Sequence, residues 1–297
     1  MPSQHTGIIT KITGGFYYVE AAGVSHECKA RGVFRRRGMT PLVGDTVEIT
    51  VPDDDGYCSI DMIGERKNML VRPAMSNLDT LVIVSSVREP NVNLYLVDKM
   101  TAAAISKGIE PVVVFTKADL GDTDALVDTY RSVGMRAFSF SAVDNRGLDD
   151  IRTIFSGRIT AFCGNSGVGK STLLNALFPQ LELKTGEISD KLGRGRHTTR
   201  TVELFSRYGG YVADTPGFST VDIERFELIR KDELKFAFPE FERFFGKCRF
   251  HSCNHLCEKG CLVLDAVDRG EIPRSRHDSY LRMYDEVKDI RDWELNR

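Results

Sequence analysis

The segment Gly164–Ser171 constrains the fold of this chain more than any other stretch. It reads Gly-Asn-Ser-Gly-Val-Gly-Lys-Ser, the G-x-x-x-x-G-K-S pattern of a phosphate-binding loop. An apolar β-forming run, Ile159–Cys163, precedes it, and a helix-forming run, Ser171–Leu177, follows and stops at Pro179. This strand, loop and helix let backbone amides and the positive end of a helix converge on phosphate oxygens. A chance glycine-rich turn is the weaker alternative, because both flanks fit.

The side chains of this loop have distinct expected roles. Lys170 is expected to bind the β- and γ-phosphates, and Ser171 is expected to bind Mg²⁺. The nucleotide-binding residues expected here are Gly164, Asn165, Ser166, Gly167, Val168, Gly169, Lys170, Ser171 and Thr172.

Length, charge and cysteine content limit the possible classes of protein. The chain has 297 residues, enough for two or three domains, and a net charge of −2, so any nucleic-acid affinity must come from local patches. No apolar run approaches the roughly 20 residues of a membrane span, and the N-terminus lacks a signal-peptide core. We therefore expect a cytoplasmic protein that does not bind a membrane. We also expect it to be a monomer. Four of the seven cysteines lie within Cys248–Cys261, which favours metal binding over disulfides.

Residues 1–68 predict a small Greek-key barrel of the OB type. Its strands are predicted from apolar and β-branched runs between turn residues, at Gly7–Ile12, Phe16–Glu20, His26–Arg31, Thr46–Val51 and Tyr57–Ile63. OB barrels often bind nucleic acid through aromatic side chains and basic loops.

A basic cluster in this segment is a candidate RNA-binding surface, and its members are Arg31, Arg35, Arg36 and Arg37. The alternative is that these arginines belong to a solvated loop. For the nearby Phe16 and Tyr18 we expect a place in the barrel core, because alternation puts both on one face.

Residues 69–225 alternate strands and helices, which predicts a parallel sheet with helices on both faces. The predicted strands are Thr80–Ser85, Val112–Phe115 and Ala137–Phe140, in addition to the strand before the phosphate loop. The predicted helices are Leu94–Lys107, Asp124–Val133 and Leu148–Phe155.

Two loops that follow these strands are candidates for binding the base. Thr116-Lys117-Ala118-Asp119 resembles the guanine-specificity motif Asn-Lys-x-Asp, and Ser141-Ala142 resembles a second base-binding loop. The Asp119 carboxylate can accept hydrogen bonds from guanine N1–H and the 2-amino group, which adenine lacks, and the Lys117 stem can cover the base. Thr116 replaces the usual Asn, so the contact of that position with the base is open. ATP use is the alternative that Asp119 argues against.

The segment after the phosphate loop is predicted to contain the two switches. Residues 192–200 are rich in glycine and arginine and lie where a GTPase places the switch that closes over Mg²⁺. We favour Thr199 as the second hydroxyl ligand of Mg²⁺, with Thr198 as the alternative. Strand Gly210–Ala213 then leads into Asp214-Thr215-Pro216-Gly217, a D-x-x-G motif. Asp214 is expected to hold Mg²⁺ through water and the Gly217 amide to face the γ-phosphate. In ordinary GTPases the base-binding loops follow the phosphate loop and the D-x-x-G motif, whereas in this chain they precede both. This order indicates a circular permutation.

Residues 226–297 predict a helical domain that binds a metal. The spacing Cys248-x₄-Cys253-x-His255-x₅-Cys261 offers three thiolates and an imidazole for one structural Zn²⁺ per chain. Cys257 and His251 lie inside the same cluster, so spacing alone does not fix the ligand set. The aromatic segment Phe236–Phe245 is expected to pack on the nucleotide-binding domain. The tail Arg274–Trp293 is predicted to be helical, with Tyr280, Tyr284, Val287 and Ile290 on one packing stripe.

The barrel, the permuted motif order and the Cys-x₄-Cys-x-His-x₅-Cys spacing together resemble the RsgA family, also called YjeQ or YloQ. The resemblance covers essentially the whole chain. It implies a bacterial GTPase that depends on the small ribosomal subunit, acts late in maturation of the 30S subunit and contacts 16S ribosomal RNA. It also implies that Cys248, Cys253, His255 and Cys261 bind the zinc, which leaves Cys257 spare. An RNA-binding module with a nucleotide-dependent conformational timer and no dedicated 30S role is the alternative.

The catalytic group is the least defined feature of the sequence. Ras-like GTPases place a glutamine just after D-x-x-G to orient the attacking water, and Phe218 occupies that position here. We expect His197, in the switch beside Thr198, to orient the water or accept its proton. The alternative is that His197 is a solvated loop residue or an RNA contact.

Overall fold

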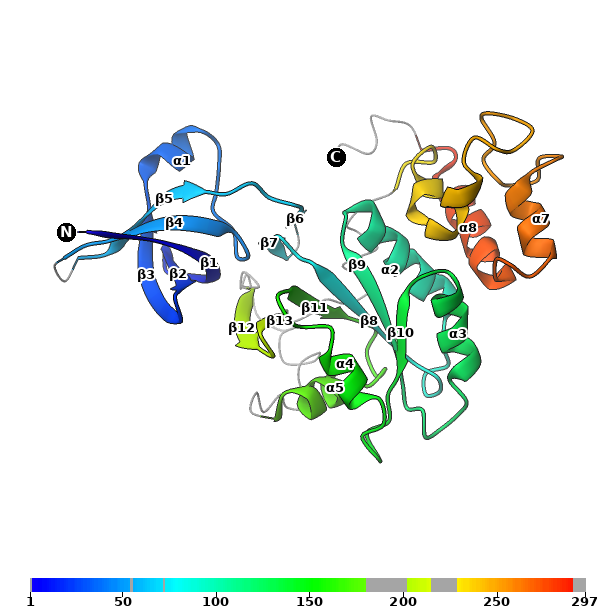
Figure 1. Cartoon of the computed structure of the whole chain (residues 1–297), viewed down its shortest axis with the longest axis horizontal. Coiled ribbons are helices and arrows are strands. Elements are labelled where there is room, and N and C mark those ends of the chain that lie inside the picture. The colour runs from blue at the N-terminus through cyan, green and yellow to red at the C-terminus, as the bar shows by residue number, and fades with distance from the viewer. Residues whose placement is uncertain (1, 54–55, 72, 180–201, 215–228, 291–297) are drawn as a thin grey trace. The chain divides into compact units, whose positions relative to one another are not determined.

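The computed structural model describes residues 2–53, 56–71, 73–179, 202–214 and 229–290. They form two compact units (Figure 1). The first contains the described residues within 1–80, 153–161 and 188–218, and the second those within 81–152, 162–187 and 219–297. Among the described residues, no helix has the length and apolar character needed to cross a bilayer.

The N-terminal strands close into a five-stranded barrel, which confirms the predicted OB-type fold. They are β1 (Ser3–Thr13), β2 (Phe16–Ala21), β3 (Val24–Ala30), β4 (Thr46–Val51) and β5 (Cys58–Ile63), with a short helix α1 (Gly32–Arg36) after β3. They pair in the order β1-β2-β3-β5-β4, and β4 returns to β1. β1 can serve both edges because it is long: its first half pairs with β4 and its second half with β2, with a register shift between Ile9 and Lys11.

The alternation of β2 is as predicted, but the face it buries is not. Val19 and Ala21 are buried in the barrel, whereas Phe16 and Tyr18 are partly exposed. The expectation that Phe16 and Tyr18 form the core was therefore wrong. A period of two fixes which residues share a face but not which face turns inward, and Tyr18 uses its outward position to donate to Glu27 at 3.3 Å.

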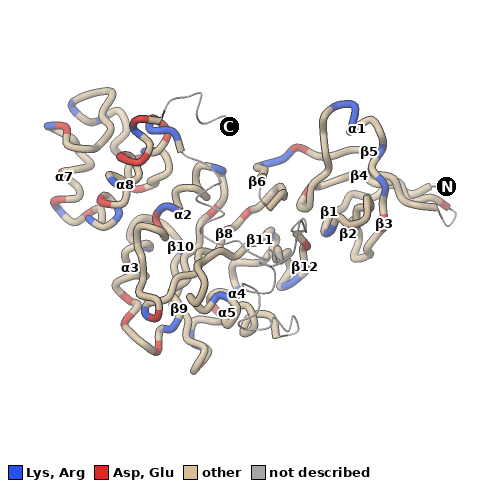
Figure 2. Tube along the Cα trace, turned by 180° about the vertical axis from the view of Figure 1, so that it is seen from behind, with Lys and Arg blue, Asp and Glu red and all other residues tan. Residues whose placement is uncertain are grey.

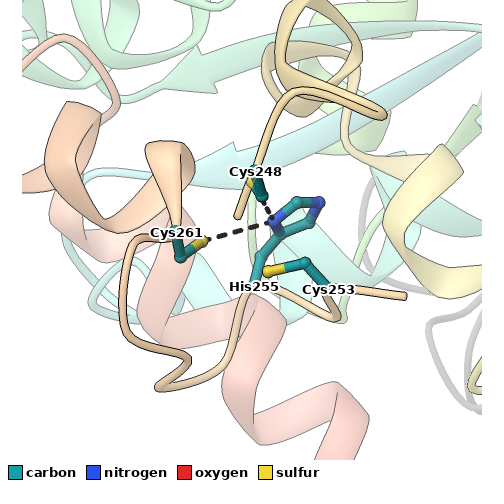
Figure 3. Close-up of side chains that lie close together, drawn as sticks. All are labelled: Cys248, Cys253, His255 and Cys261. Atoms are coloured by element: carbon teal, nitrogen blue, oxygen red, sulfur yellow. Dashed lines mark hydrogen bonds between the residues drawn. The ribbon is translucent and has the colours of Figure 1, made fainter. Parts of the chain in front are cut away.

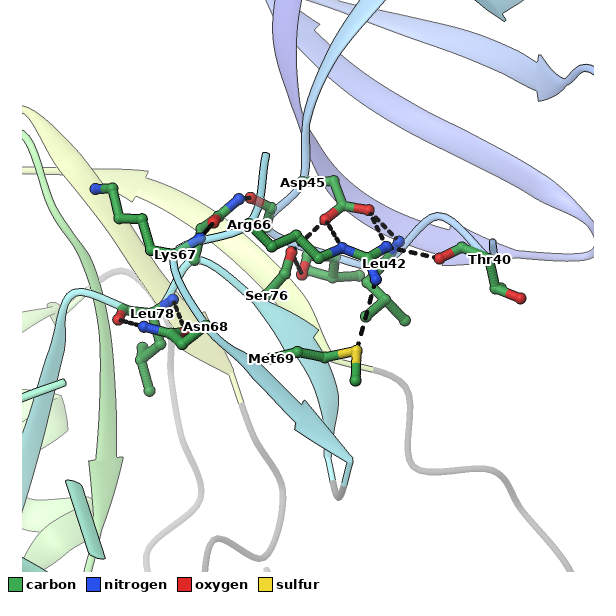
Figure 4. Close-up of polar contacts among 12 residues, drawn as sticks. Thr40, Leu42, Asp45, Arg66, Lys67, Asn68, Met69, Ser76 and Leu78 are labelled. Atoms are coloured by element: carbon green, nitrogen blue, oxygen red, sulfur yellow. Dashed lines mark hydrogen bonds and ion pairs between the residues drawn. The ribbon is translucent and has the colours of Figure 1, made fainter. Parts of the chain in front are cut away.

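A buried carboxylate joins the barrel to the segment that follows it (Figure 4). This segment forms a hairpin of β6 (Met69–Val71) and β7 (Ala74–Ser76). Asp45, fully buried before β4, accepts hydrogen bonds from Arg66 Nε at 2.7 Å and from Ser76 Oγ at 2.6 Å. The Leu42 amide donates to its second oxygen at 2.7 Å. Because a buried charge is costly unless it is paired and hydrogen-bonded, this set fixes the hairpin against the barrel.

The first unit also contains β12 (Glu203–Arg207), β13 (Gly210–Asp214) and the first three residues of β11 (Ile159–Cys163). β11 runs parallel to β13, with Thr160 opposite Val212, and β12 and β13 form an antiparallel hairpin. Lys11 of β1 pairs with Glu203 of β12. The last two residues of β11 belong to the second unit, so this strand leads from one unit into the other.

The second unit contains the predicted parallel sheet, in the strand order β10-β9-β8-β11. Its strands are β8 (Thr80–Ser86), β9 (Glu110–Thr116) and β10 (Arg136–Ser139), and β9 and β10 run parallel. Its helices are α2 (Leu94–Ser106), α3 (Asp124–Ser132), α4 (Leu148–Arg152) and α5 (Lys170–Leu177). Figure 1 shows α2 and α3 on one side of these strands and α4 and α5 on the other.

The C-terminal elements have their own aromatic core. They are η2 (Leu234–Ala237), η3 (Pro239–Phe244), α7 (Leu262–Asp268) and α8 (Arg274–Val287). The rings of Phe238, Phe241 and Tyr280 lie 5.0–5.3 Å apart in stacked and edge-on pairs. Ala102 of α2 belongs to the same buried cluster, which confirms that the aromatic segment packs on the nucleotide-binding domain.

Candidate nucleotide site and metal centre

The phosphate-binding loop lies where the sequence predicts it, between β11 and α5. All five residues of β11 are buried, and Gly164 follows at its carboxyl end. A Cβ on Gly164 would lie 2.5 Å from the carbonyl oxygen of Val84, so only glycine allows this approach to β8. Gly169 caps α5 with a φ of 83°, which lets the helix begin at Lys170. Lys170 and Ser171 thus stand at a helix N-terminus, where phosphate is bound favourably.

Thr116 joins the phosphate-binding loop to the first base-binding loop. It ends β9, is buried, and donates its hydroxyl to the carbonyl oxygen of Val168 at 2.5 Å. The residue that replaces the usual Asn therefore holds two loops together. This hydrogen bond is a structural role for Thr116, and its expected contribution to nucleotide binding stays a prediction.

The two candidate base-binding loops are also bonded to each other. The Ala118 amide donates to Phe140 O at 3.1 Å, and Arg146 Nη2 donates to Ala118 O at 2.8 Å. Ser141 is buried and accepts from the Val143 amide at 3.3 Å. Ala142 lies beside Ser141 in the same loop.

Asp119 and Lys117 are held differently. Asp119 is exposed just beyond β9, as a carboxylate that reads a base must be. Lys117 has a left-handed backbone, with a φ of 56°, and its ammonium donates to the carbonyl oxygen of Glu89. The loop after β8 therefore positions the lysine stem that is expected to cover the base.

Several predicted site residues lie outside the described residues. They are His197, Thr198, Thr199, Gly217 and Phe218. Asp214 is the last residue of β13, and its backbone pairs with Glu203. Their expected roles stay predictions.

A cavity of about 210 Å³ lies beside the phosphate-binding loop. Gly164, Asn165 and Val168 line one side of it, and Val97 and Met100 of α2 line another. Sequence reasoning did not anticipate that α2 and the phosphate-binding loop line one cavity.

Four residues of the C-terminal segment converge as a candidate metal centre (Figure 3). The ligand atoms of Cys248, Cys253, His255 and Cys261 all lie within 4.8 Å of one another. His255 Nδ1 is 3.7 Å from Cys248 Sγ and 3.4 Å from Cys261 Sγ. A tetrahedral zinc ion with Zn–S of about 2.3 Å and Zn–N of about 2.05 Å separates N from S by about 3.5 Å. The donor set therefore fits zinc in both chemistry and spacing.

The structure also separates these four residues from the other candidates. Cys257 and His251 are exposed, while Cys253, His255 and Cys261 are buried. Burial raises the pKa of the Cys253 thiol to about 12 and lowers the pKa of His255. Neutral imidazole is the form that binds metal, whereas the thiols need a cation to ionise at neutral pH.

The basic cluster of the barrel lies on and around α1, where Figure 2 shows a run of Lys and Arg. Arg35, Arg36 and Arg37 are exposed, and Phe34 anchors the helix in the barrel. Arg31 is exposed as well, but it pairs with Asp61 at 2.8 Å. Three of the four predicted arginines thus project into solvent around α1, and the fourth is partly engaged.

Comparison with known proteins decides the family. A model of the RsgA GTPase family matches residues 63–224, and a model of the RsgA N-terminal domain matches residues 6–58. The chain belongs to the RsgA GTPase family. Two relatives carry the name small ribosomal subunit biogenesis GTPase RsgA. The protein from Geobacillus kaustophilus is 44% identical to this chain, over 95% of this chain and 97% of the relative. The protein from Streptococcus pneumoniae is 43% identical to this chain, over 96% of each.

Solved structures of the RsgA family agree along the whole chain. YjeQ from Thermotoga maritima matches with a TM-score of 0.84 and 35% identity, over 97% of this chain and all of that one. YloQ, described as a circularly permuted GTPase, matches with a TM-score of 0.82 and 35% identity, over 97% and 96% of the two chains. The order of motifs in this chain is therefore the permuted order of its family.

We predict that Thr116→Val weakens GDP binding about fivefold, because the loss of one hydrogen bond of about 1 kcal/mol frees the phosphate-binding loop from β9. Thr160→Val is the matched control, since the Thr160 hydroxyl is buried without a partner among the described residues. Isothermal titration with GDP measures both variants. Equal affinities for Thr116→Val and the unmodified protein would contradict the role of Thr116.

Proposed function

We propose that this RsgA family protein hydrolyses GTP to GDP and phosphate when the small ribosomal subunit stimulates it, and acts as a late factor in 30S assembly. One observation carries the proposal: a phosphate-binding loop and a guanine-type loop are bonded together in a chain whose full-length relatives are named for small-subunit biogenesis. Because the partner is the ribosomal subunit, the protein works in the cytoplasm, and we propose that it does so as a monomer.

Each domain of the chain takes one task in this proposal. Residues 1–68 form the OB-type RNA-binding domain, which contacts 16S ribosomal RNA through Arg31, Arg35, Arg36 and Arg37. Residues 69–225 form the circularly permuted GTPase domain, and residues 226–297 form the zinc-binding helical domain. The exposed arginines around α1 support the first assignment.

In this proposal the nucleotide is bound by the residues of the motifs that the sequence identifies. Lys170 and the amides of the phosphate-binding loop hold the phosphates, and Asp119 reads guanine. Ser171 and Thr199, or Thr198 in its place, bind Mg²⁺, which neutralises phosphate charge when it is present. Asp214 and Gly217 complete the γ-phosphate side.

GTP hydrolysis with and without purified 30S subunits tests the proposed function. The rate should rise many-fold with 30S subunits and stay basal with 50S subunits or free 16S RNA. Stimulation by free RNA equal to that by 30S would favour the alternative, an RNA-binding module with a conformational timer.

We predict that Asp119→Asn exchanges guanine specificity for xanthine specificity. GTP binding should weaken by about 1–3 kcal/mol, because the base donors lose their acceptor. Xanthosine triphosphate should bind better, since the Asn amide can pair with the added carbonyl. Asp128→Asn, the same charge change on the exposed face of α3, is the control. Competition of GTP, ATP and xanthosine triphosphate measures this, and equal GTP and ATP affinity in the unmodified protein would refute it.

We predict one zinc ion per chain, held by Cys248, Cys253, His255 and Cys261. Cys253→Ala should lose most of the zinc and unfold the C-terminal domain, because structural zinc contributes folding free energy. Cys257→Ala should retain the metal, since Cys257 is exposed and outside the cluster. Metal analysis and limited proteolysis measure both variants. Full zinc in Cys253→Ala, or none in carefully purified unmodified protein, would disprove the site.

His197 is the proposed catalytic residue, because Phe218 stands where Ras-like GTPases carry the water-orienting glutamine. We predict that His197→Ala abolishes the 30S-stimulated rate but keeps GTP affinity within a few-fold, since the contact is made in the transition state. Single-turnover hydrolysis and GTP titration separate the two effects. Stimulated turnover that survives His197→Ala would move the role to Arg194, Arg196 or a ribosomal group.

A further inference from the structure

A buried arginine in α8 binds carboxylates from two other segments of the second unit. The Arg276 side chain is fully buried, and its Nη1 donates to Asp98 Oδ1 of α2 at 2.7 Å. Its Nε donates to Glu240 Oε1 of η3 at 2.8 Å. Tyr130 of α3 also donates to Asp98, at 2.8 Å. Such a set is costly to desolvate and depends on good geometry, so it tolerates little movement of α8 against α2.

The same helix holds the backbone of the metal-binding loop. His277, next to Arg276, donates from Nε2 to the carbonyl oxygen of His255 at 2.8 Å. One turn further on, the Tyr280 hydroxyl donates to the carbonyl oxygen of Asn254 at 2.5 Å. Both acceptors belong to the segment that carries the metal ligands, so α8 and the metal centre move together.

The other end of this network reaches the nucleotide site through α2. Val97 and Met100 line the cavity beside Gly164 and Val168 of the phosphate-binding loop. Asp98 immediately follows Val97, so the turn of α2 that binds Arg276 is the turn that faces the loop. A shift of this turn would change the shape of the cavity that α2 shares with the loop.

An outer set of contacts joins the same two helices at the surface. Glu286 of α8 accepts from Tyr95 Oη at 2.5 Å and from Lys99 Nζ at 2.9 Å. Arg282 lies 3.8 Å from the centre of the Tyr95 ring. These groups are partly exposed, so they contribute less than the buried set.

We propose that zinc binding and nucleotide binding are thermodynamically linked through α8 and α2, and that Arg276 is the positioning residue that carries the linkage. Zinc orders the loop that α8 holds, Arg276 fixes α8 to α2, and α2 supports the phosphate-binding loop. Linkage is reciprocal, so bound nucleotide strengthens zinc binding by the same factor. The inference rests on the zinc site proposed above but not on any ribosomal role.

Removing Arg276 alone cannot test this, because it would leave two buried carboxylates without their cationic partner and strongly destabilise the region. The test therefore uses an apolar replacement of the three charged residues and Tyr130, D98L/Y130F/E240L/R276M. Thr101, which accepts from Arg276 Nη1 at 3.1 Å, can stay because its hydroxyl also donates to the backbone carbonyl of residue 98 at 2.8 Å. Buried ion networks replaced by apolar side chains of similar volume often keep or gain stability. The matched control, E286Q/R282M, removes charges of the outer set and leaves the buried one.

Affinity for a fluorescent GDP analogue is measured on zinc-loaded and chelator-stripped protein, with zinc content determined for each sample. In the unmodified protein and the E286Q/R282M control, loss of zinc should weaken GDP binding at least about fivefold. In the apolar variant the two values should agree within about twofold. The reciprocal experiment uses folded, zinc-loaded protein only: saturating GDP should raise zinc affinity against a chromogenic chelator in the first two proteins and not in the third.

Equal GDP affinity of the loaded and stripped unmodified protein, together with zinc affinity that GDP does not change, would overturn the linkage. Undiminished linkage in the apolar variant would remove Arg276 from it. A chain that holds no zinc would overturn the linkage together with the zinc site. Failure of 30S stimulation would leave all these measurements unaffected, so the two proposals fail separately.

Discussion

The hydrogen bond from Thr116 to Val168 joins two loops that lie 52 residues apart in the sequence. We expect the nucleotide site to depend on this contact, because phosphate and base must be bound at a fixed separation. Parallel strands bring their carboxyl ends to one edge of a sheet, whatever the order in which the chain visits them. Circular permutation therefore leaves this edge of the sheet intact. The small side chain of Thr116 is long enough to join the two loops that meet there.

The second structural constraint is the buried charge between the nucleotide-binding domain and the C-terminal elements. Apolar packing of Phe238, Phe241 and Tyr280 against α2 alone would tolerate small shifts between these elements. Arg276 adds directional hydrogen bonds to Asp98 and Glu240, which favour one geometry, although Asp98 Oδ2 is buried without a partner among the described residues. The buried charges thus select one arrangement of α8 against α2 and do not necessarily make the fold more stable.

Much of this fold follows from local sequence pattern, and the exceptions have physical causes. Thr46–Val51 and Ile159–Cys163 were predicted with their observed bounds, because turn residues flank each apolar run. Phe16 and Tyr18 were placed on the wrong side of β2, because periodicity does not identify the buried face. The zinc ligand set was open by spacing alone, and the family resemblance implied the four residues that the structure brings together, while Cys257 is exposed outside them. The roles of Asp45 and Arg276 were missed, although Arg276 lies on the stripe of Tyr280, Tyr284 and Val287, where a charge predicts a buried partner.

The permuted order attaches the C-terminal domain to the nucleotide-binding domain in two different ways. In the sequence it follows the D-x-x-G motif, whose Gly217 is expected to face the γ-phosphate. In space it is bonded to α2, which lines the cavity beside the phosphate-binding loop. A domain with only the first attachment would follow the switch passively. In the linkage proposed above, the second attachment lets zinc binding in the C-terminal domain act on the nucleotide site, and α2 is the element that connects the two.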